Sequence, residues 1–192
     1  MSVIGEPHVH LWTRQEYHQM AELGFFTRQR VELIEGQVIV ISPMRGAHAT
    51  AVALAAKTVE PVFGPGYFAR WQMPFRIGDL SEPEPDVAII MGDIRDYVDE
   101  HPTTTALIIE VADTSLTYDR VTKGSLYAKA GIRDYWIINL VNRRVEVHRN
   151  PLPDAEASYD HRYADITIFG EQDSVTPLAQ PQARIAVSDV LP

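Results

Sequence analysis

The chain has 192 residues, of which 45% are hydrophobic, so it can bury a core and widespread disorder is excluded. It has no cysteine, which excludes disulfides, thiolate metal sites and cysteine nucleophiles. The net charge of −9 disfavours general binding to nucleic acid, so any DNA contact must come from a local basic surface. A metal site would account for part of the acidity, because such sites concentrate carboxylates.

The first half of the chain predicts helices, a hairpin and an interrupted strand. The predicted elements are a helix at 14–23, a hairpin at 31–41, a helix at 47–63 and a strand at 67–77. Thr13 and Glu16 have the spacing of a capping box, which marks the start of the first helix. Gly64 ends the second helix, and Pro74 interrupts the strand.

The second half predicts buried strands around one helix. The predicted elements are strands at 86–90, 106–111, 135–139 and 145–148 and a helix at 118–130. Short apolar runs bounded by breakers are typical of strands buried on both faces. The strand, helix, strand order from Leu107 to Asn139 predicts a crossover and therefore a partly parallel sheet. Beyond Pro151 the pattern predicts short strands and turns.

No apolar run approaches the roughly 20 residues of a membrane span. The first eleven residues also lack the basic start and apolar stretch of a secretory signal. We therefore expect a soluble, cytoplasmic protein without a membrane partner.

Two acids stand at the edges of buried strands. Asp86 opens one apolar run directly after Pro85, and Glu110 lies near the end of another. A carboxylate in such a place is costly unless it is paired or bound to a metal. On neighbouring strands, Asp86 and Glu110 could share one cation such as Mg²⁺. The alternative is that both acids end their strands and face solvent.

Lys123 is a third candidate. It shares a largely apolar stripe of the predicted helix with Leu116, Tyr127 and Ala130, so its ammonium could point toward a carboxylate or a phosphate. The alternative is a surface lysine paired with Asp119 four residues earlier.

Three further residues, on the first hairpin and at the start of the second helix, are candidates for the site. Glu32 and Glu35 flank the first hairpin turn on opposite faces of the strand, so one of them could reach a metal and the other would be solvated. His48 begins the second helix, where it could contact phosphate or a metal-bound water or be purely structural.

An ordered series of motifs resembles a known family. The series is Val31-Glu32-Leu33-Ile34-Glu35-Gly36, Ser42-Pro43, His48, Pro85-Asp86-Val87-Ala88, Ile109-Glu110-Val111, Asp119, Lys123, Tyr127-Ala128-Lys129-Ala130-Gly131-Ile132 and Asp134-Tyr135-Trp136-Ile137-Ile138. It covers roughly residues 11–149 and resembles the Uma-type putative restriction endonuclease family, a branch of the PD-(D/E)XK nuclease superfamily.

The resemblance implies an α/β (α+β) restriction-endonuclease-like fold, with a central mixed β-sheet flanked by helices. We expect one nuclease-like domain over residues 1–192, with a core at about 11–149 and a C-terminal β-rich extension at 150–192. The resemblance also implies a metal-dependent endonuclease that hydrolyses DNA. The alternatives are a nuclease-like module that binds DNA or protein without catalysis, and a hydrolase of a small phosphoester.

The resemblance assigns roles to single residues. Asp86, Glu110, Lys123 and Glu32 would be catalytic, with His48 and Asp119 as possible substrate or supporting residues. Asp86, Glu110 and the carbonyl of Val111 would hold Mg²⁺ or Mn²⁺. The chain departs from the superfamily pattern at Ala112, where a lysine is usual, and Lys123 on the following helix would replace it. We also expect a homodimer, because two weak basic faces acting together would bind DNA more tightly.

Overall fold

The computed structural model describes residues 7–192, which form two compact units. The first comprises residues 7–43 and 76–83, and the second comprises residues 44–75 and 84–192. The prediction about a secretory signal falls partly on residues 1–6, outside the described residues. Within residues 7–192, no helix is long and apolar enough to span a membrane.

A short helix and a hairpin make up most of the first unit. Helix α1 (Arg14–Glu22) begins after Thr13, and the Thr13 and Glu16 side chains each accept a hydrogen bond from the other residue's main-chain N–H. These bonds satisfy donors that the first helical turn leaves open. Strand β1 (Arg30–Ile34) pairs antiparallel with β2 (Gln37–Ile41). The predicted capping box and hairpin are both confirmed.

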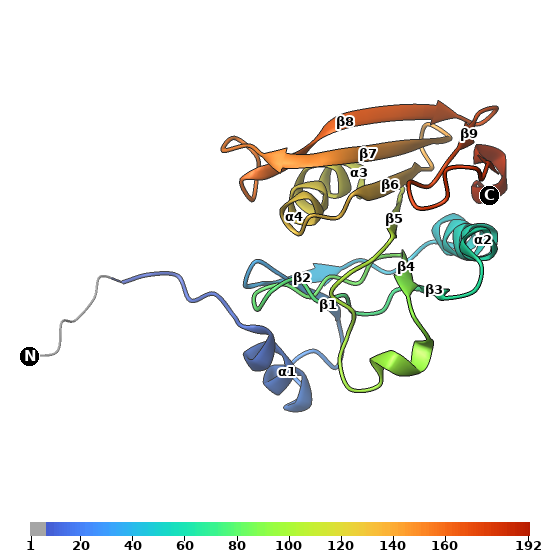
Figure 1. The fold of residues 1–192 in the computed structure, drawn as a ribbon. Helices are drawn as coiled ribbons and strands as arrows, with labels where there is room; N and C mark the ends of the chain where they lie inside the picture. Colours follow the sequence, from blue (N-terminus) through green and yellow to red (C-terminus); the bar gives the residue numbers. More distant parts are fainter. Residues whose placement is uncertain (1–6) are drawn as a thin grey trace, which may run out of the picture. The chain divides into compact units, whose positions relative to one another are not determined.

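The second unit contains a six-stranded mixed sheet with the strand order β3-β4-β5-β6-β7-β8 (Figure 1). Its strands are β3 (Tyr67–Arg70), β4 (Val87–Met91), β5 (Leu107–Ala112), β6 (Asp134–Asn139), β7 (Arg144–Pro153) and β8 (His161–Gly170). Strands β5 and β6 run parallel, and every other neighbouring pair runs antiparallel. The parallel pair confirms the predicted crossover.

Each face of this sheet is covered by helical structure. On one face, Ile109 and Val111 of β5 belong to an apolar core with helix α2 (Gly46–Phe63) and the C-terminal segment. Because side chains alternate along a strand, Ile108 and Glu110 face the opposite side. There lie the short helices that follow β5. The expected mixed sheet flanked by helices is confirmed.

The predicted helix at 118–130 is confirmed as a continuous helical segment, but it contains a π-helical turn. The chain forms α3 (Leu116–Tyr118), a π-helical turn η2 (Asp119–Lys123) and α4 (Gly124–Lys129). The N–H of Gly124 donates to the carbonyl of Asp119 five residues earlier, and that carbonyl also accepts a hydrogen bond from the hydroxyl of Tyr135. Such single π-turns are frequent at functional sites.

Two strand predictions also need correction. The predicted strand at 67–77 ends at Arg70, because Gln72 adopts a left-handed backbone with φ of 52° and Pro74 lacks an N–H for a ladder. Beyond residue 151 the chain forms the ten-residue edge strand β8, longer than the short strands predicted. Its side chains are mostly exposed, so burial imposes only a weak apolar pattern on its sequence.

The remaining elements are short. They are the 3-10 helices η1 (Ile94–Tyr97) and η3 (Val187–Val190) and the paired strands β9 (Ser174–Val175) and β10 (Ile185–Ala186).

Candidate active site

Asp86 and Glu110 lie side by side at one end of the β4–β5 ladder. The antiparallel register pairs Val87 with Ile109, so the next position places Asp86 opposite Glu110. The main-chain N–H of Asp86 lies 3.4 Å from Oε2 of Glu110. Both residues are buried, with 7% and 2% of their surfaces exposed. The condition for sharing a cation is met, because strand β4, which follows Asp86, is the neighbour of β5, and the alternative that both acids face solvent is wrong.

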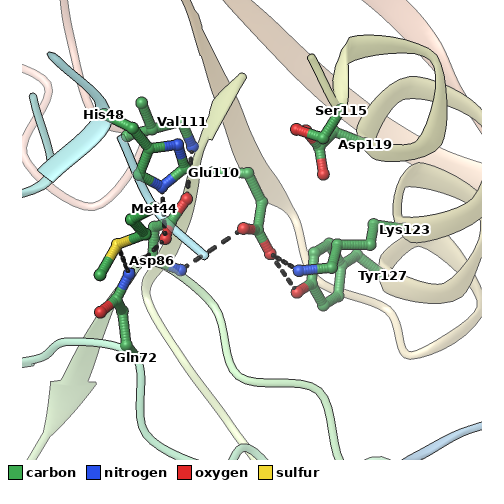
Figure 2. A network of polar contacts seen from close by, with 10 residues as sticks. All are labelled: Met44, His48, Gln72, Asp86, Glu110, Val111, Ser115, Asp119, Lys123 and Tyr127. Atoms are coloured by element: carbon green, nitrogen blue, oxygen red, sulfur yellow. Dashed lines mark hydrogen bonds and ion pairs between the residues drawn. The ribbon is translucent and has the colours of Figure 1, made fainter. Parts of the chain in front are cut away.

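The Asp86 carboxylate is held by three donors from three segments (Figure 2). Oδ2 accepts a hydrogen bond of 2.8 Å from the N–H of Val111. Oδ1 lies 3.0 Å from Nε2 of Gln72 and 3.2 Å from Nε2 of His48. With both oxygens engaged, the carboxylate has one fixed orientation.

Burial raises the pKa of Asp86, but the hydrogen bond and charge of His48, with Lys123 and Gln72, outweigh it and lower the pKa below its ordinary value. The same hydrogen bond raises the pKa of His48, against the effect of burial. The site therefore favours an ionised carboxylate beside a histidine that gains a proton readily.

Glu110 contacts two donors from the following helical segment. Its Oε1 lies 2.9 Å from Nζ of Lys123 and accepts a hydrogen bond of 2.6 Å from the hydroxyl of Tyr127. Lys123 is only 5% exposed and Tyr127 is fully buried. The expectation that its ammonium points to a carboxylate is confirmed, and the alternative of a surface lysine paired with Asp119 is wrong.

The helical segment presents Asp119, Lys123 and Tyr127 to the site at four-residue spacing. Asp119 is buried and accepts a hydrogen bond of 2.5 Å from the hydroxyl of Ser115 (Figure 2). The π-turn η2 ends at Lys123, and α4 then carries Tyr127. From this one segment Lys123 and Tyr127 contact Glu110, whereas the side chain of Asp119 contacts Ser115.

The oxygen donors suit a hard divalent cation. The two carboxylates and the carbonyl of Val111 are the ligand types that Mg²⁺ and Mn²⁺ prefer, and water and phosphate oxygens commonly complete the shell. Among residues 7–192, no three or more His, Asp or Glu side chains gather in a group that could hold a metal ion. The protein would therefore supply two carboxylates, and water and phosphate oxygens would supply the remaining ligands.

The site also contains residues that the sequence reasoning did not assign. Tyr127 was recognised only as part of the helical stripe, although its spacing of four residues from Lys123 was the available signal. Gln72 carried no signal, because its contact depends on a left-handed backbone. Glu32 is buried in β1 of the first unit, and its membership in the site stays a prediction.

Comparisons with known proteins bear on the fold and the family of the chain. The crystal structure of a putative nuclease of family DUF820 from Anabaena variabilis is similar, with a TM-score of 0.70 and 19% sequence identity, covering 93% of this chain and 96% of that one. A search of curated proteins found no match. The model of the Uma2 family, described as putative restriction endonuclease, matches residues 14–188. The chain therefore belongs to the Uma2 family.

Proposed function

We propose that the chain is a metal-dependent endonuclease that hydrolyses phosphodiester bonds in DNA. The observation that carries the proposal is the buried pair Asp86 and Glu110, with the ammonium of Lys123 2.9 Å from Glu110. Family membership supports a nuclease, and the oxygen donors support a divalent cation.

Asp86, Glu110 and the carbonyl of Val111 would hold Mg²⁺ or Mn²⁺. When bound, such an ion acts as a Lewis acid and lowers the pKa of water. The protein keeps the donors oriented, since the N–H of Val111 fixes Asp86 while Lys123 and Tyr127 fix Oε1 of Glu110. Oε2 of Glu110 is on the side of Asp86, where a shared ligand would lie.

Lys123 supplies the positive charge that Ala112 lacks. A lysine at position 112 would point to the same sheet face as Glu110, two residues earlier on β5. The helical segment covers that face, and Lys123 reaches Glu110 from it. Its ammonium can orient the attacking water or stabilise charge that develops on the phosphate. His48 and Asp119 support this arrangement, and Glu32 is proposed to bind a metal-bound water or a second ion.

The decisive experiment is cleavage of circular plasmid and of labelled linear DNA with Mg²⁺, Mn²⁺ or EDTA. We expect nicked or linear plasmid with metal only, and at least a hundredfold loss of rate in Asp86→Asn and Glu110→Gln. The matched control is Asp99→Asn, because Asp99 is exposed and lies outside the site. Full activity in either site variant, or equal activity in EDTA, would show that the assignment is wrong.

One observation favours a second candidate, a nuclease-like module that binds without cleaving. Within residues 7–192 no group of three or more His, Asp or Glu side chains could hold a metal ion, and the chain carries a net charge of −9. Calorimetry with Mg²⁺ and Mn²⁺ distinguishes the nuclease from the binding module. The nuclease should bind the metal, whereas a binding module needs none. Bis(p-nitrophenyl) phosphate as a substrate then tests for a small-phosphoester hydrolase.

We also propose that the chain acts as a homodimer. Its acidity leaves a single copy with weak affinity for DNA, and two copies acting together raise the effective concentration of their basic surfaces. Light scattering at micromolar concentration should give twice the chain mass, and a purely monomeric solution would contradict the proposal.

A further inference from the structure

A pocket of about 330 Å³ lies within the second unit, between η2–α4 and the β7–β8 hairpin. Its walls include Arg120, His148, Asp154, Glu156, Arg162 and Tyr163. None of its wall residues belongs to the Asp86–Glu110 network of Figure 2. Its volume falls in the range of small-molecule sites, which begins at about 300 Å³.

His148 is the unusual residue of this pocket. It is 3% exposed, and its Nε2 has no hydrogen-bond partner among residues 7–192. Its ring packs at centroid distances of 5.4 Å from Tyr135 and 5.8 Å from Tyr163. A buried nitrogen without a partner is costly, so nearly all buried polar groups in proteins have one. A ligand in the pocket could supply it.

The imidazole of His148 is neutral at physiological pH. Burial, with a contribution from Arg120, lowers its pKa to about 4, although Glu146 opposes the shift. A neutral imidazole has one donor nitrogen and one acceptor nitrogen. It is therefore suited to a ligand with hydrogen-bonding groups on a planar ring, and Tyr163 provides an aromatic neighbour.

The positive and negative charges of the wall residues nearly cancel. Arg162 is paired with Asp154 at 2.6 Å, and Arg120 donates two hydrogen bonds to Glu146. Glu156 adds a negative charge at an exposed position. The pocket therefore offers no excess positive charge to an anion, whereas its carboxylates can accept hydrogen bonds from hydroxyl groups.

We propose that this pocket binds a nucleoside, with the base beside His148 and Tyr163 and the sugar hydroxyls toward Asp154 and Glu156. An uncharged ligand with a planar heteroaromatic ring and hydroxyls matches the neutral imidazole, the aromatic wall and the carboxylates together. The site is separate from the Asp86–Glu110 network, so the inference does not depend on cleavage of DNA.

Calorimetry and NMR of the histidine ring protons test the proposal, with adenosine, guanosine, cytidine and thymidine as probes. At least one nucleoside should bind saturably and shift the His148 signals. The His148→Phe variant keeps an aromatic ring and should lose about tenfold in affinity or more. The control Asp99→Asn changes an exposed residue outside the pocket, so its affinity should change less than about twofold.

Two further variants test which part of the nucleoside each wall residue contacts, and whether binding occurs in this pocket and not at the proposed metal site. Glu156→Ala should weaken nucleoside binding but leave the affinity for free adenine unchanged. Asp86→Asn should bind nucleosides as the native chain does. The proposal is overturned if no nucleoside binds at millimolar concentration, if His148→Phe binds as well as native, or if Asp86→Asn abolishes binding. Preference for inorganic phosphate over every nucleoside would also overturn it.

Discussion

The hydroxyl of Tyr127 donates a hydrogen bond of 2.6 Å to Oε1 of Glu110, the same oxygen that lies 2.9 Å from Nζ of Lys123. Two donors from one helical segment thus engage one carboxylate oxygen, and Oε2 is on the side of Asp86. Tyr127 acts through Glu110, so it is a positioning residue in the proposed site.

Replacing Tyr127 with Phe tests this positioning role. The ring stays in place, and the loss of a hydrogen bond to a charged group should cost about 2 kcal/mol of unfolding free energy. Because Glu110 loses a donor that fixes its orientation, affinity for Mg²⁺ measured by calorimetry should fall as well. Tyr67→Phe is the control, since the Tyr67 hydroxyl has no hydrogen bond within residues 7–192. Lower stability with unchanged metal affinity would leave Tyr127 only a structural role.

Lys123 and Glu110 should be energetically coupled. Lys123→Met leaves a buried carboxylate without its cation, which should destabilise the fold by about 3 kcal/mol. In the double variant Lys123→Met/Glu110→Gln both charges are absent, so the total cost should be well below the sum of the single costs. Urea unfolding of the four proteins measures the cycle. Additive costs would mean that the ion pair contributes no coupling.

Features that depend on neighbouring residues, and strands that are buried, could be predicted from the sequence. The Thr13–Glu16 capping box depends only on neighbouring residues, and it formed as expected. The parallel pairing of β5 with β6 followed from the lengths of apolar runs and of the helix between them. Asp86 and Glu110 could be singled out because a charge at the edge of an apolar run is physically unusual.

Features that depend on distant contacts were not predictable. The π-turn at Asp119–Lys123 has no residue pattern of its own, and its extra carbonyl bond comes from Tyr135 on another element. The contact of Gln72 with Asp86 needs a left-handed backbone at a residue other than glycine. Strand β8 lies at an exposed edge, where little burial shapes the sequence.

His148 should make the fold sensitive to mild acid. Its pKa is about 4 in the folded chain and 6.5 in the unfolded chain, so the unfolded state binds more protons between these values. Stability is therefore full above pH 6.5 and should fall by about 3 kcal/mol as the pH drops toward 4. Urea unfolding between pH 7 and 4.5 measures this loss.

The His148→Phe variant should remove most of that loss while costing little at pH 7, because Nε2 has no partner within the described residues. Glu146 does not interfere, since the pKa of this carboxyl is lowered to about 2 and its contribution is lost only below pH 4.5. An unchanged pH profile in His148→Phe would assign the acid sensitivity to other groups.

Divalent metal should stabilise the native chain apart from any catalysis. An ion that binds only the folded state adds about 3 kcal/mol at a concentration a hundredfold above its dissociation constant. For a chain of this size the melting temperature should then rise by roughly 5–10 °C. The rise should saturate with Mg²⁺ or Mn²⁺, reverse with EDTA and disappear in Asp86→Asn, whereas Asp99→Asn should behave like the native chain. A rise that persists in Asp86→Asn would place the bound ion away from Asp86 and Glu110, and the role of these two carboxylates would need another explanation.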